Sequence, residues 1–249
     1  MYGAVSRHLQ ALYAYARHVD DVGDEPGALD EVARQIGRLY AGRPIADPVV
    51  RALEPAVTGH CLPQGPLLRL IEAGRPDRAT GRYPSFGRLT EYCTLSANPV
   101  GELVLHVFGR ATAERIALSN RIRTALWVIE HLRDVPEDRR RGRVYLPGED
   151  MARFGVTEDD LDGPAAPPDL RDLIALTAQR AEAWLDSGAP LVSTLDGRAR
   201  LTVGGQVAGG RAGLTALARA EFDPLANRVT VPRRLVLRHW ATATVAAAG

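Results

Sequence analysis

The protein has 249 residues, with 31 basic against 30 acidic side chains and a formal net charge of +1. Apolar residues make up 45% of the chain and charged residues 24%, which is typical of a folded globular protein and excludes a disordered one. The balanced charge argues against a dedicated nucleic-acid-binding protein, so no nucleic-acid partner is expected.

Helical periodicity dominates from the start of the chain. Between His8 and Asp21, apolar side chains recur at intervals of three and four residues, which is one stripe of an amphipathic helix. Similar spacing predicts helices near residues 28–41, 46–59, 66–74, 85–95, 112–134, 169–187, 198–221 and 231–246. Only 143–147 suggests an extended segment. We therefore predict an all-α fold, with a single domain over residues 1–249 and an internal loop at about 162–168.

The end of the first predicted helix carries an acidic motif. Asp20, Asp21 and Asp24 are spaced so that all three carboxylates can share one helix face. Because carboxylates that share one face of a helix repel each other, a cation is expected beside them. Carboxylate oxygens completed by substrate phosphates are the ligands that Mg²⁺ prefers. A solvated acidic helix end is the alternative interpretation of this motif taken alone.

A second acidic motif lies at the end of the predicted helix 112–134. Glu130, Asp134 and Asp138 recur one helical turn apart, and four arginines follow within residues 139–143. Pro136 removes a backbone donor, so we expect a kink or a helix end at 134–136. Carboxylates followed by arginines suit a site where metal ions bridge the protein to a diphosphate and arginines neutralise the leaving group.

These motifs predict one composite site. We expect the two acidic clusters to face each other across one cavity. Arg139 and Arg143 are the candidates for binding the diphosphate, with others of the arginine run on the solvated surface.

Glycines repeat in the predicted helix 198–221. Gly205, Gly209 and Gly213 stand at every fourth position. Glycine costs about 0.5–1 kcal/mol relative to alanine inside a helix, so we expect another helix to approach this face closely.

Several segments together resemble the squalene/phytoene synthase family. The likeness is carried by residues 20–24, by 134–147 and by the segment YCTLSANPVG at 92–101, in the order of the family. Residues 207–211 are similar to a late segment of the bacterial squalene synthases of hopanoid pathways. The likeness extends to about Leu225. It implies an all-helical isoprenoid synthase fold with a central cavity.

The resemblance also implies an activity. Family members join two prenyl diphosphates head to head through a cyclopropyl diphosphate. The subgroup most similar to this chain ionises presqualene diphosphate, made from two farnesyl diphosphates, to hydroxysqualene or squalene. Mg²⁺ is the implied cofactor, and no nicotinamide cofactor is expected. Phytoene-type condensation of longer substrates is the alternative.

Residue roles follow from the same resemblance. Asp20, Asp21 and Asp24 match the first metal-binding motif of the family, and Asp134 and Asp138 match the second. Arg17 matches an arginine that contacts the diphosphate. Tyr92 matches a cavity tyrosine whose ring could stabilise a passing cation, with core packing as the alternative.

The chain departs from the family pattern at several points. Glu130 stands where many relatives carry Asn but still offers an oxygen to a metal, and Trp127 replaces a common Gln and would narrow the pocket. The family's N-terminal segment has no counterpart in this sequence. A second hypothesis is therefore a truncated, non-catalytic relative that binds prenyl diphosphates or pairs with a paralogous synthase.

The cysteines, the apolar runs and the C-terminal segment of the sequence predict where the protein is located. Cys61 and Cys93 are isolated, and no apolar run approaches the roughly 20 residues of a membrane-spanning helix, so we expect a cytoplasmic protein. The segment 231–240 mixes arginine with leucine and tryptophan. It suits either peripheral contact with the inner membrane face or a docked terminal helix.

Overall fold

The computed structural model describes residues 2–23, 25, 27–79, 81–226 and 228–246. Within these residues the protein is built from helices, and the β-type pairing is an isolated bridge between Arg82 and Val144. The all-α prediction is confirmed, and the bridge lies in the segment expected to be extended. The helices are α1 (Tyr2–Val22), α2 (Ala28–Tyr40), α3 (Pro48–Arg51), α4 (Glu54–His60), α5 (Gln64–Ala79), α6 (Phe86–Ser96), α7 (Asn98–Val107), α8 (Ala113–Arg133), α9 (Val135–Arg140), α10 (Gly148–Phe154), α11 (Pro168–Gly188), α12 (Gly197–Arg219) and α13 (Arg233–Ala246), with two 3₁₀ turns, η1 (Asp159–Leu161) and η2 (Ala189–Thr194).

Side-chain caps fix the starts of several helices. The hydroxyl of Thr112 accepts a hydrogen bond from a backbone amide in the first turn of α8, and Ser85 does the same for α6. The Asp47 carboxylate accepts bonds from two amides of α3. Such bonds satisfy donors that a helix start leaves without a partner, which defines where these elements begin.

Prolines explain where the predicted helices differ from the observed ones. The helix expected over 46–59 is two short helices, α3 and α4, and Pro55 lies in the first turn of α4, where its missing N–H costs nothing. Helix α7 was not predicted. It begins directly after α6 with Pro99 in its first turn, so a new helix starts where the sequence pattern indicated an end.

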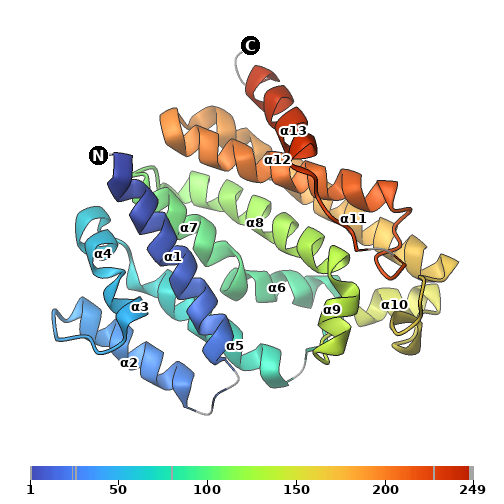
Figure 1. The fold of residues 1–249 in the computed structure, drawn as a ribbon, viewed down its shortest axis with the longest axis horizontal. Coiled ribbons are helices and arrows are strands. Elements are labelled where there is room, and N and C mark those ends of the chain that lie inside the picture. Colours follow the sequence, from blue (N-terminus) through green and yellow to red (C-terminus); the bar gives the residue numbers. More distant parts are fainter. Residues whose placement is uncertain (1, 24, 26, 80, 227, 247–249) are drawn as a thin grey trace.

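Helix α8 lies in the middle of the molecule (Figure 1). It packs most extensively against α11 and also against α7 and α12, while α1 lies over α5 and α7 on the other side. Helix α13 packs against α12, so the docked interpretation of the tail describes its position. None of the described helices combines the length and the hydrophobicity needed to cross a membrane.

The glycine-rich face of α12 meets its neighbours at only some of the expected positions. A Cβ atom at Gly213 would lie 2.7 Å from Cγ2 of Ile129 on α8, which confirms a close approach there. At Gly205 and Gly209 a Cβ atom would meet nothing within 4 Å, so the expectation is wrong for these two. Gly210, outside the predicted repeat, also packs tightly, against Leu126 and Leu185.

Candidate functional site

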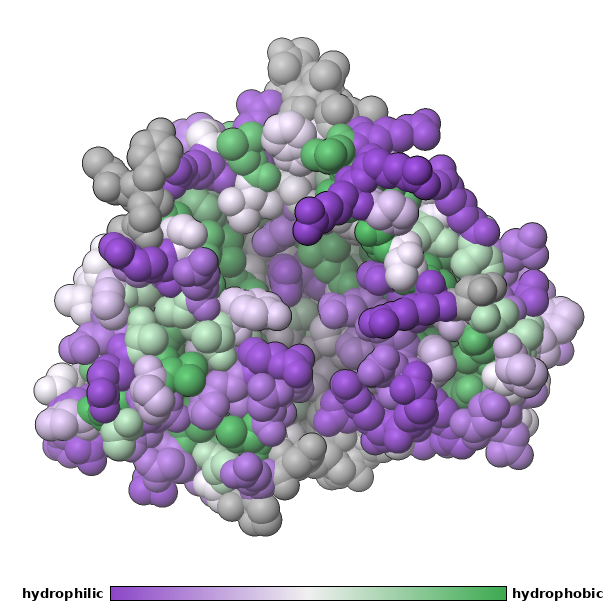
Figure 2. Space-filling model, in the orientation of Figure 1, coloured by the Kyte–Doolittle hydropathy of each residue, from purple (hydrophilic) through white to green (hydrophobic). Residues whose placement is uncertain are grey.

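A cleft with a volume of about 530 Å³ opens between the first helices and the middle of the chain. Figure 2 shows this face hollowed near its centre, with hydrophilic side chains around the hollow. One wall comes from α1, α5 and α6, and the other from α8, α9 and the segment that follows α9. Its polar lining residues are Tyr13, Arg17, Asp20, Tyr92, Ser96, Trp127, Glu130, His131, Asp134, Glu137, Asp138, Arg141, Arg143, Tyr145 and Arg228.

The last turns of α1 bring the first acidic motif to the cleft. Asp20 and Arg17 line it. Arg17 lies 3.1 Å from Asp21 and 3.9 Å from Asp20, so its guanidinium supplies the positive charge that these carboxylates require. Asp21 is not among the lining residues. Asp24 lies outside the residues that the structure describes.

The second acidic motif is divided between two helices. Helix α8 ends at Arg133, and α9 starts at Val135 with Pro136 in its first turn, so the predicted break is confirmed. Asp134 is the residue between them, at the C-cap position of α8 and the N-cap position of α9. Glu130, Asp134 and Asp138 all line the cleft, with Asp138 coming from α9. The prediction that the two motifs share one cavity is confirmed for the described residues.

Asp138 is buried against an imidazole. Its residue is 7% exposed, and its Oδ2 accepts a 2.7 Å hydrogen bond from Nδ1 of His131. No sequence motif marks His131, although it lies four residues after Trp127 and so on the same face of α8. The bond fixes the orientation of both side chains, because the carboxylate accepts while the ring donates.

The arginines after the second motif divide between two environments. Arg141 and Arg143 line the cleft. Arg139 does not, because its guanidinium forms a bidentate ion pair with Asp162 and a further bond to Glu158 on the far side of the segment. The prediction that Arg139 binds a diphosphate is therefore not supported by its position. Arg228 reaches the cleft from the segment before α13, and no motif in the sequence marks it.

Aromatic rings form the floor beside the acidic residues. The centroid of Trp127 lies 5.6 Å from that of Tyr92, 4.9 Å from that of Tyr145 and 4.1 Å from that of His131. The Tyr92 hydroxyl donates to the Ala73 carbonyl at 3.3 Å, which turns the ring edge toward α5. Ring faces attract cations, so this floor suits a site that handles positive charge.

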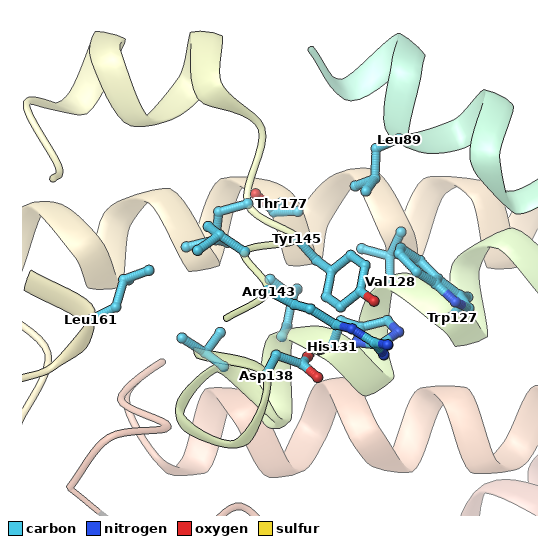
Figure 3. A pocket seen from close by; sticks show the side chains of 13 residues that line it. Leu89, Trp127, Val128, His131, Asp138, Arg143, Tyr145, Leu161 and Thr177 are labelled. Atoms are coloured by element: carbon cyan, nitrogen blue, oxygen red, sulfur yellow. Dashed lines mark hydrogen bonds and ion pairs between the residues drawn. The ribbon is translucent and has the colours of Figure 1, made fainter. Parts of the chain in front are cut away.

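A small apolar pocket lies behind this floor (Figure 3). Trp127, His131 and Tyr145 separate it from the cleft, since all three line both spaces. Its other walls include Leu89, Val128 and Leu161, which come from α6, α8 and η1 and are buried in the same hydrophobic cluster.

Burial shifts the pKa values of two side chains near the cleft, Cys93 and Arg123. Burial raises the pKa of the Cys93 thiol to about 12, which disfavours the thiolate form that a nucleophilic cysteine needs. Burial lowers the pKa of the Arg123 guanidinium, with the charge of Glu130 acting in the opposite direction. Arg123 and Glu130 line a groove of about 330 Å³ between α8 and α12, next to the cleft.

The donor set of the cleft fits a hard metal ion that also binds its substrate. The carboxylates are all-oxygen donors, which suits Mg²⁺. Within the described residues, no three Asp, Glu, His or Cys side chains lie close enough to hold a metal ion by themselves. The oxygens of a bound diphosphate would therefore have to complete the coordination, which is how Mg²⁺ commonly binds in phosphate-handling sites.

The chain is similar to known proteins over most of its length. The sequence pattern of the family described as squalene/phytoene synthase matches residues 3–240. A phytoene synthase of Arthrospira platensis is 31% identical over 242 residues, which cover 89% of this chain and 78% of that protein. A phytoene synthase of Mycobacterium tuberculosis is 32% identical and is covered to 65%. The chain spans about half of the chloroplast phytoene synthase 1 of Arabidopsis thaliana, of which 49% is covered.

Solved structures with the same fold include two synthases. A squalene synthase of Alicyclobacillus acidocaldarius superposes with a TM-score of 0.82 at 38% identity, covering 88% of this chain and 84% of that one. A dehydrosqualene synthase in complex with a ligand superposes with a TM-score of 0.88 at 24% identity, covering 98% and 90%. The second likeness concerns the fold alone.

Proposed function

Because the chain belongs to the squalene/phytoene synthase family, we propose that it catalyses a head-to-head reaction of prenyl diphosphates in this cleft. The observation that carries the proposal is that residues of both acidic motifs line one cleft, together with arginines and an aromatic floor. Acid side chains for a metal, basic side chains for a diphosphate and rings for a cation are the three components that such chemistry needs.

The carboxylates would hold Mg²⁺ against the substrate diphosphate. When bound there, Mg²⁺ would supply positive charge beside the departing diphosphate, which is the chemistry that ionisation of the substrate needs. Asp20 approaches from α1, while Glu130 and Asp134 approach from the end of α8. The full set of proposed ligands is Asp20, Asp21, Asp24, Glu130, Asp134 and Asp138.

Arginines on both walls would bind the diphosphate itself. Arg17 on α1 and Arg143 after α9 line the cleft from opposite sides, so each could donate to phosphate oxygens. Arg228 and Arg141 are two further donors at its edge. Diphosphate binding would also release Arg17 from Asp21, leaving that carboxylate available to the metal.

The aromatic floor would take the organic part of the substrate. Trp127 lies within ring-contact distance of both Tyr92 and Tyr145, and ring faces stabilise a nearby cation by about 0.5–2 kcal/mol each. The same rings exclude water from the apolar side of the cleft, which protects a carbocation from early capture.

Squalene-type chemistry is the first candidate, with presqualene diphosphate converted to hydroxysqualene or squalene. It is supported by the 38% identity to the squalene synthase of Alicyclobacillus acidocaldarius and by the similarity of residues 207–211 to that group. Phytoene-type condensation is the second candidate, because the curated relatives are named phytoene synthases at 29–32% identity.

Substitution of a carboxylate on each wall tests the proposal. We expect Asp20→Asn and Asp134→Asn to lower Mg²⁺-dependent turnover of presqualene diphosphate by about 100-fold or more, because each removes a charge from the transition-state environment. Products are analysed by mass spectrometry, and circular dichroism reports whether the variants are folded.

Asp196→Asn is the matched control, since Asp196 is exposed and paired with Arg110 away from the cleft. Parental turnover in either cleft variant would refute the metal assignment. Conversion of geranylgeranyl diphosphate but not of presqualene diphosphate by the parent would select the phytoene-type reaction.

A further inference from the structure

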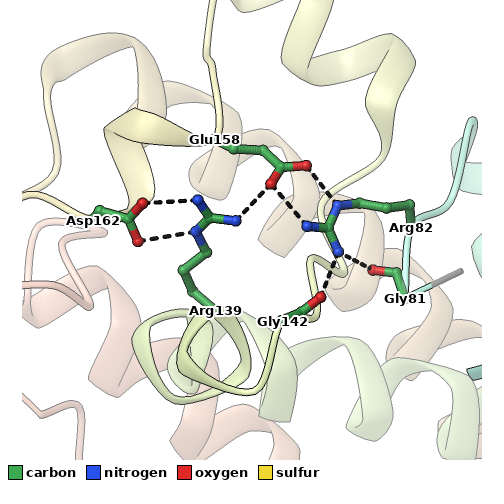
Figure 4. Close-up of polar contacts among 6 residues, drawn as sticks. All are labelled: Gly81, Arg82, Arg139, Gly142, Glu158 and Asp162. Carbon is green, nitrogen blue, oxygen red and sulfur yellow. Dashed lines mark hydrogen bonds and ion pairs between the residues drawn. The ribbon is translucent and has the colours of Figure 1, made fainter. Parts of the chain in front are cut away.

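Figure 4 shows an ion-pair network of Arg82, Glu158, Arg139 and Asp162, none of which lines the cleft. The network contacts Gly142, which directly precedes the cleft residue Arg143. The centre of the network is Glu158, which precedes η1. Arg82 donates to this carboxylate through Nε at 2.5 Å and Nη2 at 2.8 Å, and Arg139 donates through Nη1 at 2.6 Å. Arg139 in turn is paired with Asp162 at 2.9 and 2.8 Å. The network therefore joins three separate segments of the chain.

Arg82 also fixes the backbone of the cleft wall. Its Nη1 donates to the carbonyl of Gly142 at 2.7 Å and to that of Gly81 at 3.1 Å. The Val144 amide donates to the Gly81 carbonyl at 2.8 Å, within the bridge that pairs Arg82 with Val144. Gly81 and Gly142 have φ values of +48° and +75°, which presents their carbonyls to one guanidinium without steric strain.

The alternation of an extended segment links this network to the cleft. Val144 is 3% exposed and does not line the cleft, whereas its neighbours Arg143 and Tyr145 both do, Tyr145 from within the same buried cluster. A shift of this segment by one residue would exchange these faces. Glu158 and Arg82 do not line the cleft themselves, so any effect they have on it must pass through the paired segments.

We propose that Glu158 is a positioning residue, which holds Arg143 and Tyr145 against the cleft by binding Arg82 and Arg139 at once. The proposal rests on the proposed function in one respect, namely that Arg143 binds the substrate diphosphate. It also gives Arg139 a role other than the diphosphate contact that its sequence position suggested.

Glu158 matters more than a carboxylate in an ordinary surface ion pair, because it is shared between Arg82 and Arg139. Single exposed pairs contribute little to stability. Glu158 instead bonds to two guanidiniums at once, and its loss would remove the carboxylate that joins Arg82 to Arg139, while Arg139 would keep its pair with Asp162. The hydrogen bond from Arg82 is the main cause that holds the pKa of Glu158 below its ordinary value, and Arg139 acts in the same direction. The carboxylate is therefore charged at neutral pH.

Hydrogen exchange tests the structural half of the proposal without any ligand. In Glu158→Gln, the peptide containing residues 142–148 is expected to exchange about tenfold faster than in the parent, because the bond of the Val144 amide is no longer supported. Peptides from α11 and α12 serve as internal controls. Arg82→Lys, which keeps the charge but loses the bidentate fork, should act in the same direction. Unchanged exchange in both variants would overturn the proposal.

A double-mutant cycle tests the functional half. Binding of inorganic diphosphate in the presence of Mg²⁺ is measured by calorimetry for Glu158→Gln, Arg143→Ala and the double variant. We expect Glu158→Gln alone to weaken binding about tenfold, and to have no further effect once Arg143 is removed. The effect of Glu158→Gln on binding should instead be fully additive with that of Arg17→Ala, because Arg17 lies on the opposite wall.

The outcomes separate this inference from the proposed function. Equal additivity in both cycles would refute the positioning role, as would weakening of similar size in the Asp196→Asn control. If the parent fails to bind diphosphate at all, the proposed function is wrong, while the exchange experiment still decides whether Glu158 holds the wall.

Discussion

His131 and Asp138 are joined by a hydrogen bond within the cleft. One oxygen of the Asp138 carboxylate accepts a 2.7 Å hydrogen bond from the imidazole of His131, and the imidazole ring packs against both Trp127 and Tyr145. Hydrogen-bonded partners of metal-ligating groups orient them, and their loss commonly costs 10–100-fold in metal affinity. His131 is therefore expected to act on metal binding through Asp138.

Replacement of the imidazole tests this expectation. We predict that His131→Phe, which keeps a ring in the aromatic floor, weakens Mg²⁺ binding in the presence of diphosphate by about tenfold, because Asp138 loses its orienting donor. Calorimetric titration gives the affinity. In an Asp138→Asn background the same change should have no additional effect, and a full additional loss there would show that the two residues act separately.

Arg139 and Arg143 show which property of a site a sequence pattern does not predict. Arg139 and Arg143 are four positions apart in one basic run, and both were predicted to bind a diphosphate. The turn after α9 directs Arg143 into the cleft and leaves Arg139 with Glu158 and Asp162. Residue type and spacing do not contain the direction of that turn, so they cannot distinguish the two.

At the scale of helices, the separation of α8 from α9 shapes the second motif. The missing N–H of Pro136 ends the hydrogen-bond ladder, and the new helix carries Asp138 under His131 rather than one turn farther along a straight axis. This break was predictable because its cause is local. The position of Asp138 after the break was not, since it depends on packing against α8.

The packing of α12 on α8 leads to a prediction with a built-in control. In Gly213→Ala the new methyl group would meet Ile129 Cγ2 at 2.7 Å, so we expect a loss of about 1–3 kcal/mol in the free energy of unfolding. In Gly209→Ala the methyl group meets nothing within 4 Å, and the higher helix propensity of alanine should add up to about 1 kcal/mol.

Urea denaturation measures both variants against the parent. The two glycines lie one turn apart in the same helix, so their difference isolates the helix contact from propensity. A stabilised Gly213→Ala variant would mean that α8 and α12 can separate without cost, contrary to the close approach described above.

For the whole molecule, the cleft lies between two parts of the hydrophobic core. One buried cluster contains residues of α1, α2, α3, α4 and α5 and of part of α7. Another contains residues of α6, α8, α9, α10 and α11 and of the end of α12. Carboxylates and arginines of the cleft come from both sides. A ligand that bridges them should therefore stabilise the folded protein as a whole, in proportion to its affinity.

Thermal unfolding measures this linkage. With Mg²⁺ and inorganic diphosphate at about 100 times the dissociation constant, stability should rise by about 2.7 kcal/mol. For a chain of this size that is a shift of about 5–10 °C in Tm. Chelation of the metal should reverse the shift, and Asp20→Asn should abolish it. An unchanged Tm in the parent would indicate that no ligand bridges the two walls.

The sequence by itself determined the helical class, the break at Pro136, the two acidic motifs and the family resemblance, because each depends on local spacing or on order along the chain. It did not determine the division of 46–59 into α3 and α4 or the start of α7, where proline begins a helix as readily as it ends one. The shared cleft of Asp20 and Asp134 was predicted from the two motifs. Only the tertiary structure added His131 and Arg228 to that cleft and assigned Arg139 to the ion-pair network with Glu158. These placements depend on contacts between residues far apart in the chain, and the direction of a side chain across such a contact is set by packing rather than by its neighbours in sequence.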